Sequence, residues 1–298
     1  MPLWKLSVTT LPEAEDAVAE LLQTTFNQRA SSYHSLEKAT TDVAVYLKRN
    51  PNWTREKRSR LLAAIENIRS AGLEVGEGRF SLRQVRSEDW VESWKKHFKP
   101  IQIGSALLIR PSWRKQKSRK GQVTVVLDPG LSFGTGQHPT TSFCLEQLVE
   151  HRLHNQAQSF LDIGIGSGIL AISAAKLGFA PVHAIDFDPD VVRIARSNAR
   201  KNRVAHKIRI VRRDVSQWEE RTKYSFICAN LISTLLVAER DRILARLDED
   251  GILVLAGILR TEFEKVKRDY ECAGMKLIAA RTENEWRSGA VAWERPEH

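Results

Sequence analysis

A glycine-rich segment after an apolar stretch is the feature of this sequence that most directly indicates chemistry. Gly164, Gly166 and Gly168 alternate with other residues, and Asp162 precedes the first of them by two positions. Glycine at a strand-to-helix turn lets the backbone approach a ligand closely, because a Cβ atom would collide with it. Ile169 stands where a dinucleotide fingerprint needs glycine, and no phosphate-binding G-K-[ST] follows. Asp162 would repel a diphosphate, so the segment favours a cationic or zwitterionic ligand.

Acidic residues also end the next two apolar stretches. Asp186 comes about 20 residues after Gly164, the spacing at which an acid accepts hydrogen bonds from the ribose hydroxyls of an adenosine ligand. Asp214 could accept a hydrogen bond from an adenine amino group, whereas Asp188, before Pro189, is expected to cap a helix. The glycines and acids in this order indicate S-adenosylmethionine. The alternative is an α/β sheet with tight turns and incidental caps.

Asn230 ends the fourth apolar stretch, and its side chain could act on a nucleophile. An amide oxygen there can accept a hydrogen bond from an amine and aim the nitrogen lone pair at a sulfonium methyl group. No dedicated base is visible, so desolvation near a cationic sulfonium is expected to lower the pKa of a lysine ammonium. The alternative is that Asn230 caps the following helix, but Ser233 is the better cap. We therefore predict that Asn230 is catalytic.

A turn-rich segment, Leu127–Thr141, contains three glycines and two prolines directly before a predicted helix over Ser142–His151. Loops on a rigid scaffold often carry binding groups. Thr141 is placed to donate a hydrogen bond to the carboxylate or ribose of the cofactor, and Phe133 could cover the ligand. His138 has no Asp, Glu or Cys at ligand spacing, so no metal site is predicted.

The elements that must position these residues alternate between strands and helices after residue 100. Strands buried on both faces read as continuous apolar runs, and five such runs are separated by helical stretches. This order predicts a doubly wound parallel sheet with the polar residues at the carboxyl ends of its strands. The predicted strands are Phe160–Ile163, Val182–Ile185, Ile208–Val211, Phe226–Ala229 and Ile252–Leu255, and the predicted helices are Ile169–Leu177, Asp190–Asn202 and Ser233–Leu247.

The first 86 residues follow a different order, β-α-β-β-α-β, which is the ferredoxin-like motif. That fold hosts many functions, so it does not identify the chemistry. The predicted strands are Leu3–Thr9, Tyr33–Lys38, Asp42–Leu47 and Phe80–Val85, and the predicted helices are Pro12–Phe26 and Asn52–Ser70.

A further helix is predicted over Ser87–Pro100, between these two halves. Ser87 suits the N-cap, and Trp90, Trp94 and Phe98 recur every fourth residue as a packing stripe. We interpret this segment as a linker helix. The predicted organisation is a ferredoxin-like α+β domain over residues 1–86, a linker helix over 87–100 and a doubly wound α/β domain over 101–298.

Composition limits the cellular context. The chain has 298 residues, of which 42% are hydrophobic and 28% charged, a soluble globular composition. Its three cysteines form no C-x-x-C pair, which favours a reducing cytoplasm over a disulfide framework. The longest apolar stretch, residues 251–259, is too short to span a membrane, and no basic-then-apolar leader begins the chain. We therefore expect a cytoplasmic protein without membrane association.

The net charge of +10 attracts anions without identifying them. Arg110–Lys120 contains six basic residues and Arg193–Arg213 contains nine, in both cases without an acid. Such stretches could contact RNA phosphates, although a solvated basic helix face is the commoner explanation. The N-terminal half lacks the strand motif of RNA-recognition domains. Both interpretations stay open.

Several of these segments together resemble the PrmA family, the lysine methyltransferases of ribosomal protein eleven of the large subunit. The run LDPGLSFGTGQHPTT is highly specific for the family, and the resemblance covers residues 87–260 well. It is carried by LDPGLSFGTGQHPTTSFCLE from Leu127, DIGIGSGILAISAAKLG from Asp162, DFDPDVV from Asp186 and ANLI from Ala229.

The resemblance implies a class I methyltransferase domain that uses S-adenosylmethionine, a linker helix, and an N-terminal domain that recognises the substrate. It implies cofactor contacts at Thr141, Gly164, Asp186 and Asn230, to which the residue pattern itself adds Asp162, Gly166 and Phe133.

Three departures from the family pattern stand out. Ile165 replaces the usual cysteine, a change that we expect to be neutral. Asn230-Leu231-Ile232 replaces the usual Asn-Ile-Leu, which should keep the carbonyl acceptors. The tail from Glu285 to His298 lacks the usual glycine-arginine ending, so the last strands are less well defined by the resemblance.

The implied substrate is ribosomal protein eleven, methylated on lysine side chains with the α-amine as a further acceptor, in the neighbourhood of ribosomal RNA. One alternative is a methyltransferase for lysines of another protein, such as the β subunit of electron-transfer flavoprotein, which a similar family modifies. Others are an RNA methyltransferase and a cofactor-binding module without catalysis. The N-terminal domain favours the ribosomal target, and Asn230 argues against a module without catalysis.

Overall fold

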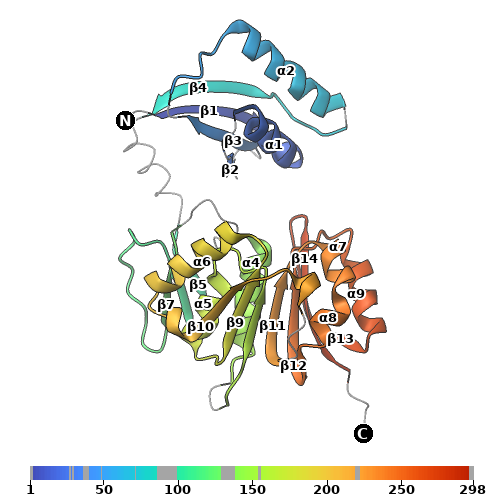
Figure 1. Ribbon diagram of the computed structural model, residues 1–298. Helices are drawn as coiled ribbons and strands as arrows, with labels where there is room; N and C mark the ends of the chain where they lie inside the picture. The colour runs from blue at the N-terminus through green and yellow to red at the C-terminus, as the bar shows by residue number, and fades with distance from the viewer. Residues whose placement is uncertain are drawn as a thin grey trace. The chain divides into compact units, whose positions relative to one another are not determined.

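The computed structural model describes residues 3–26, 28, 30–35, 40–47, 49–70, 72–85, 99–128, 138–153, 156–218 and 222–294. The chain forms two compact units, Met1–His97 and Phe98–His298 (Figure 1). The predicted linker helix lies outside the described residues except for Lys99 and Pro100, which have no regular secondary structure. Within the described ranges, no helix is both long and apolar enough to cross a membrane.

The first unit is an antiparallel sheet in the order β2-β3-β1-β4 with two helices. This topology confirms the predicted ferredoxin-like motif. Leu6 and Val8 of β1 lie opposite Val45 and Val43 of β3, and these residues form one core with buried residues of both helices. The elements are β1 (Leu3–Thr10), α1 (Glu15–Phe26), β2 (Ser31–Ser35), β3 (Thr40–Leu47), α2 (Arg55–Ser70) and β4 (Arg79–Val85).

The second unit is built on a seven-stranded sheet in the order β10-β9-β8-β11-β12-β14-β13. The first five strands in that order are parallel, whereas β14 runs antiparallel to both of its neighbours. The predicted doubly wound parallel sheet is confirmed, with an antiparallel C-terminal hairpin added. The strands are β8 (Phe160–Ile163), β9 (Val182–Asp186), β10 (Ile208–Arg212), β11 (Tyr224–Asn230), β12 (Leu247–Ala256), β13 (Met275–Glu283) and β14 (Trp286–Trp293).

Helices cover both faces of this sheet (Figure 1). Buried residues of α4, α5 and α6 pack with alternate strand residues such as Ala184 and Cys228 in one core. Those of α7, α8 and α9 pack with the intervening residues, such as Leu161 and Ile185. Burial on both faces explains the continuous apolar runs in the sequence. The helices are α4 (Pro139–Glu150), α5 (Ile169–Leu177), α6 (Pro189–Lys201), α7 (Ser233–Ala238), α8 (Arg240–Leu244) and α9 (Phe263–Cys272).

A small sheet that the sequence did not predict precedes α4. It consists of β5 (Ile101–Ile103), β6 (Leu107–Arg110) and β7 (Val123–Val126). Asn202, at the end of α6, holds β7 in place, because its side chain accepts a hydrogen bond from the Val126 N–H at 2.8 Å and donates one to the Val126 carbonyl at 2.7 Å.

The structure corrects two predicted helices. Helix α4 begins at Pro139 rather than at Ser142, in keeping with the preference of proline for a first helical turn. The helix predicted over Ser233–Leu247 is two short helices that meet at Glu239. Leu247 is in fact the buried first residue of β12. Apolar spacing alone does not separate a short helix from a short strand.

Candidate cofactor site

The glycine-rich segment forms the turn between β8 and α5, as predicted. Gly164, Gly166 and Gly168 have φ angles of 79°, 54° and 85°, in the left-handed region that favours glycine. A Cβ atom at Gly164 would lie 2.7 Å from Leu231 Cδ2, so a side chain at this position would displace the Leu231 side chain. The turn therefore brings backbone rather than side chains to the carboxyl end of β8.

Three predicted site residues lie on one face of the sheet at the carboxyl ends of neighbouring strands. Asp162, Asp186 and Asn230 occupy the alternate positions whose apolar members, such as Ala184 and Cys228, face α4, α5 and α6. Strand β8 lies between β9 and β11 in the sheet. The fold therefore gathers these three polar side chains beside the glycine turn.

The Asp162 side chain is fully buried and only partly satisfied. Its Oδ2 accepts a hydrogen bond of 3.1 Å from the Ala171 N–H in the first turn of α5, and its Oδ1 has no partner within the part of the chain that the structure describes. Burial raises the pKa of Asp162 well above its usual value, and the Asp186 carboxylate raises it further. A buried oxygen without a partner costs free energy, so the site fits a ligand with a cationic donor.

Thr141 supplies a second buried oxygen without a partner among the described residues. It is the third residue of α4, is 1% exposed, and its Oγ1 makes no hydrogen bond to them. Cys144, one turn further along α4, belongs to the same core as Cys228, and Cys228 is the register partner of Asp162. Thr141 and Asp162 therefore belong to the same region between α4 and the sheet.

Asp186 joins the end of β9 to the glycine turn. Its Oδ2 accepts a hydrogen bond from the Gly166 N–H at 3.4 Å, and its Oδ1 accepts one from the Asp188 N–H at 3.1 Å. Burial raises the pKa of Asp186, and these hydrogen bonds act in the opposite direction. A carboxylate has about four acceptor positions, so Asp186 keeps the capacity to bind hydroxyl groups.

Asn230 lies between the segments that follow β8 and β12. Its backbone oxygen is 3.6 Å from the place where a Cβ atom at Gly164 would stand, and its Oδ1 is 3.0 Å from the corresponding place at Gly257. Gly257 directly follows β12 and has a φ of 81°, and a Cβ atom there would also lie 2.6 Å from the Leu231 carbonyl oxygen, so glycine is favoured beside the Asn230 side chain. The Asn230 amide thus lies at the carboxyl end of β11, where the predicted methyl transfer would occur.

The interpretation of Asn230 as a helix cap is wrong, and so is the expectation that Ser233 is the cap. Ile232 is the N-cap of α7 and makes no side-chain capping bond. Ser233 is the first helical residue, and its Oγ donates a hydrogen bond to Glu262 Oε2 at 2.6 Å. The conformation of Asn230 is therefore not explained by capping.

Three exposed apolar side chains near the carboxyl ends of the parallel strands were not predicted from the sequence. Phe187 follows Asp186 and is 71% exposed, Ile232 follows Asn230 closely and is 66% exposed, and Leu259 lies beyond β12 and is 39% exposed. Single exposed apolar residues are ordinary, but these three follow the carboxyl ends of parallel strands, where open α/β sheets bind ligands. For Phe187 and Ile232, the signal available in the sequence was their position next to or near the predicted residues Asp186 and Asn230.

Asp188 caps α6, as predicted, because its Oδ1 accepts a hydrogen bond from the Asp190 N–H at 2.7 Å. Asp214 caps a short 3-10 turn, where its Oδ1 accepts hydrogen bonds from the Ser216 N–H and Oγ, and these bonds lower the pKa of Asp214. The contact of Asp214 with adenine stays a prediction.

Phe133 lies outside the described residues, so its predicted role of covering the bound ligand also stays a prediction.

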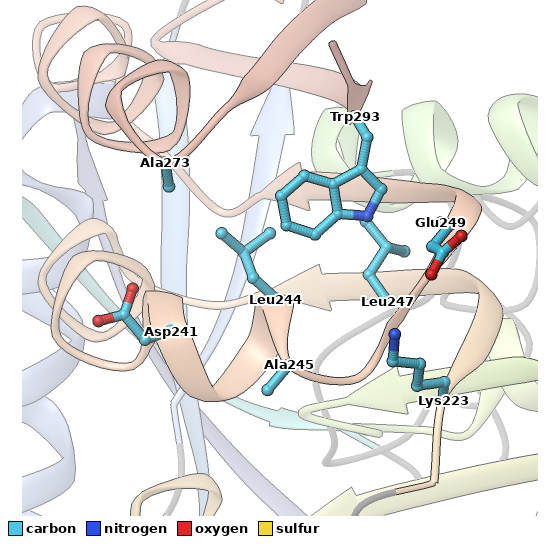
Figure 2. A pocket seen from close by; sticks show the side chains of 8 residues that line it. All are labelled: Lys223, Asp241, Leu244, Ala245, Leu247, Glu249, Ala273 and Trp293. Atoms are coloured by element: carbon cyan, nitrogen blue, oxygen red, sulfur yellow. The ribbon is translucent and has the colours of Figure 1, made fainter. Parts of the chain in front are cut away.

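A separate pocket of about 390 Å³ lies in the same unit but away from these residues (Figure 2). Figure 2 shows the Trp293 indole near Leu244 and Leu247. Because Leu247 begins β12, the pocket is at the amino ends of the parallel strands, opposite the candidate site. The pocket is lined by Lys223, Asp241, Leu244, Ala245, Leu247, Glu249, Ala273 and Trp293. Elsewhere too, the described residues contain no group of His, Cys, Asp and Glu side chains that could hold a metal ion.

The strand order, the reversed C-terminal hairpin and the glycine turn beside Asp162 and Asp186 define the class of the second unit, which is a class I methyltransferase that uses S-adenosylmethionine. The family model described as Ribosomal protein L11 methyltransferase (PrmA) matches residues 2–292, and the chain belongs to this family. The resemblance seen in the sequence is thereby confirmed.

Individual relatives agree with this assignment. A ribosomal protein L11 methyltransferase of Alkaliphilus oremlandii is 36% identical over 215 residues, which are 72% of this chain and 68% of the relative. One of Trichlorobacter lovleyi is 40% identical over 204 residues, 67% of this chain and 66% of the relative. This chain also matches the crystal structure of a ribosomal protein L11 methylase from Lactobacillus delbrueckii subsp. bulgaricus, with 26% sequence identity and a TM-score of 0.60. The match covers 66% of this chain and 100% of the chain in that structure.

Proposed function

We propose that this chain transfers methyl groups from S-adenosylmethionine to lysine side chains of ribosomal protein L11, with the α-amine as a further acceptor. The observation that carries the proposal is the pair of buried oxygens, Asp162 Oδ1 and Thr141 Oγ1, that lack a partner among the described residues. A carboxylate accepts and a hydroxyl can donate, which matches the ammonium and carboxylate of the methionine part of the cofactor. The names of the relatives supply the substrate.

The remaining site residues suit the nucleoside part of the cofactor. The Asp186 carboxylate would accept hydrogen bonds from the ribose hydroxyls, and the backbone at Gly164 and Gly166 leaves space for close approach. The exposed Phe187 ring follows Asp186 directly and would lie against the adenine, an apolar contact with an aromatic base. Phe133 would cover the bound cofactor.

When bound, the cofactor supplies an electrophilic methyl group on a sulfonium. In our proposal Asn230 Oδ1 accepts a hydrogen bond from the substrate amine and orients its lone pair toward that methyl group. Desolvation at the sheet edge and the nearby positive charge lower the pKa of the substrate ammonium, so that the neutral amine is reached without a dedicated base. The proton of the amine passes to solvent as the new nitrogen–carbon bond forms.

We infer that residues 1–86 recognise the protein substrate. The support is a groove of about 690 Å³ between α1 and α2. Leu21, Phe26 and Leu61 line it with apolar surface, and Lys57 and Arg60 contribute exposed cations. An apolar groove with charges beside it suits a segment of another protein.

We also infer that the edge of the sheet beside β10 lies near ribosomal RNA when the substrate is engaged. Arg203, Lys207 and Arg209 are exposed on this edge, in a stretch that contains no acid. Such a surface would make RNA association steeply dependent on salt. Because the proposed substrate is a ribosomal protein, we also propose that the reaction takes place in the cytoplasm.

The proposal is tested by incubating the full chain with radiolabelled cofactor and purified ribosomal proteins, followed by mass spectrometry of the labelled band. We expect methylated lysines in ribosomal protein L11. Label in the β subunit of electron-transfer flavoprotein or in RNA, with none in L11, would replace the substrate assignment. Cofactor binding without any transfer would make the chain a binding module.

A further inference from the structure

Helix α4 carries Thr141, and within the described residues its N-terminus has neither a side-chain cap nor an acidic residue in its first turn. Its N-cap residue is His138. Pro139 presets the backbone at the first helical position but has no N–H to donate. The position of Thr141 therefore depends on contacts from other parts of the fold.

Arg281 of β13 makes three such contacts. Its Nη2 donates a hydrogen bond to the Pro139 carbonyl at 3.2 Å, and its Nη1 pairs with Glu146 Oε2 at 2.5 Å. Its guanidinium carbon lies 5.6 Å from the centre of the Phe143 ring. One planar guanidinium therefore contacts three residues of α4, and its fixed fork of donors restricts the helix in several directions.

Trp286, the first residue of β14, contacts the residue that precedes α4. Its ring meets the His138 ring edge-on, with centroids 5.1 Å apart and an interplanar angle of 64°. His138 Nδ1 in turn lies 2.7 Å from Thr140 Oγ1, next to Thr141 in the chain. The hairpin of β13 and β14 thus reaches the start of α4 at two separate points.

We propose that Arg281 and Trp286 are positioning residues for the cofactor site, which hold the first turn of α4 so that Thr141 Oγ1 meets the cofactor. This inference rests on the proposed function, in which Thr141 binds the cofactor. It gives the C-terminal hairpin, where the sequence departs from the family ending, a role in binding. Neither residue touches the reacting atoms in this proposal.

The hairpin itself offers a matched control. Arg287 of β14 lies 4.6 Å from the centre of the Phe263 ring and pairs with Glu264 at 3.2 Å, both on α9. The two arginines thus make the same kinds of contact, an aromatic ring and a glutamate, with helices on opposite faces of the sheet. Arg287→Met removes these contacts without touching α4.

The experiment compares Arg281→Met, Arg281→Lys and Arg287→Met in the full chain, by calorimetric titration with S-adenosylmethionine and by thermal unfolding. We expect Arg281→Met to weaken cofactor binding by about tenfold or more, since small misplacements of binding groups are costly. Arg281→Lys keeps a cation near Glu146 and should restore part of the affinity. The cofactor affinity of Arg287→Met should stay within about twofold of that of the unaltered chain. Its loss of stability should be similar to that of Arg281→Met.

A double-mutant cycle with Thr141→Val separates positioning from general destabilisation. If Arg281 acts through Thr141, Arg281→Met weakens cofactor binding much less in the Thr141→Val background than in the unaltered chain. Additive effects, or equal losses of affinity for Arg281→Met and Arg287→Met, would overturn the inference. Failure of the unaltered chain to bind the cofactor would instead overturn the proposed function.

The same double-mutant cycle with Trp286→Leu in place of Arg281→Met tests the contact of Trp286 with His138. Recovery of cofactor affinity by Trp286→Phe is expected, because an aromatic ring is restored at this position.

Discussion

At the scale of single residues, the site combines buried polar oxygens that have no hydrogen-bond partner among the described residues. Asp162 illustrates what the sequence could and could not give. Its place before the glycines predicted a carboxylate for a cationic group, and the structure adds that only one of its oxygens has a partner among the described residues. Thr141 was predicted from its place at a helix start, but its burial depends on tertiary packing that no local pattern encodes.

Asp162→Asn tests the charge of this residue while keeping an oxygen to accept from the Ala171 N–H. We expect cofactor affinity to fall by about tenfold or more, because a charge-assisted hydrogen bond to the ammonium becomes a neutral one. Stability without cofactor should be unchanged or higher, since a buried carboxylate is removed. Calorimetric titration and thermal unfolding measure the two quantities. Equal cofactor affinity would remove Asp162 from the ammonium contact.

The raised pKa of Asp162 also predicts a pH dependence. The folded protein holds this proton more tightly than the unfolded chain, so the group contributes stability that is fully present below its usual pKa of 3.8 and is lost as pH rises through the folded value. We therefore expect the stability difference between Asp162→Asn and the unaltered chain to grow in favour of the variant as pH rises above 3.8. A difference independent of pH, measured by denaturant unfolding, would contradict this.

Asn230→Ala tests the predicted orientation of the substrate amine. Positioning effects of this kind are worth about a hundredfold or more, so we expect methyl transfer to fall by that factor while cofactor affinity changes little. Single-turnover kinetics with saturating cofactor measure the transfer step. Unchanged transfer would remove Asn230 from the mechanism, and loss of cofactor binding alone would limit it to the binding role.

At the scale of elements, the segments that follow β8 and β12 pack closely against Asn230 and Leu231 at the end of β11, at two glycine positions, Gly164 and Gly257. The strand-turn-helix from Phe160 to Leu177 follows the prediction because its burial on both faces and its left-handed glycines are local signals. The break at Glu239 and the small sheet around β6 had no such signal, since their short apolar runs fit either period. Contacts across the fold decide those elements.

Gly257→Ala tests this packing, with Gly121→Ala as its control. The two glycines have φ angles of 81° and 80°, but a Cβ atom at Gly257 would lie 2.6 Å from the Leu231 carbonyl oxygen, whereas nothing lies within 4 Å at Gly121. We expect Gly121→Ala to cost about 1–2 kcal/mol, the usual cost of the left-handed conformation. Gly257→Ala should cost more and slow methyl transfer, because Asn230 Oδ1 is also displaced. Equal effects of both variants on stability and transfer would contradict the close approach.

At the scale of the whole molecule, the chain has two units with separate cores, for which we propose separate roles. The order of elements was sufficient to predict both folds, because an alternating β-α pattern and a β-α-β-β-α-β pattern have few compatible topologies. The groove between α1 and α2 could not be predicted, since it depends on how the two helices pack over the sheet. Its proposed role is recognition of the protein substrate.

Charge reversal at the groove tests that role. The double variant Lys57→Glu with Arg60→Glu alters the groove, and Arg55→Glu with Arg58→Glu makes the same change of charge on the same helix outside it. We expect the groove variant to raise KM for ribosomal protein L11 by about tenfold, with cofactor affinity unchanged, and the control to have a smaller effect. Equal effects of the two variants in steady-state kinetics would show that only overall charge matters.

The central claim is that the glycine turn, Asp162 and Thr141 together hold S-adenosylmethionine. Equilibrium dialysis of the full chain against labelled cofactor tests it most directly. The account predicts saturable binding of one molecule per chain that is displaced by S-adenosylhomocysteine and weakened by Asp162→Asn. Folded protein that takes up no cofactor, or binds it equally well with Asp162→Asn and Thr141→Val combined, would contradict the account.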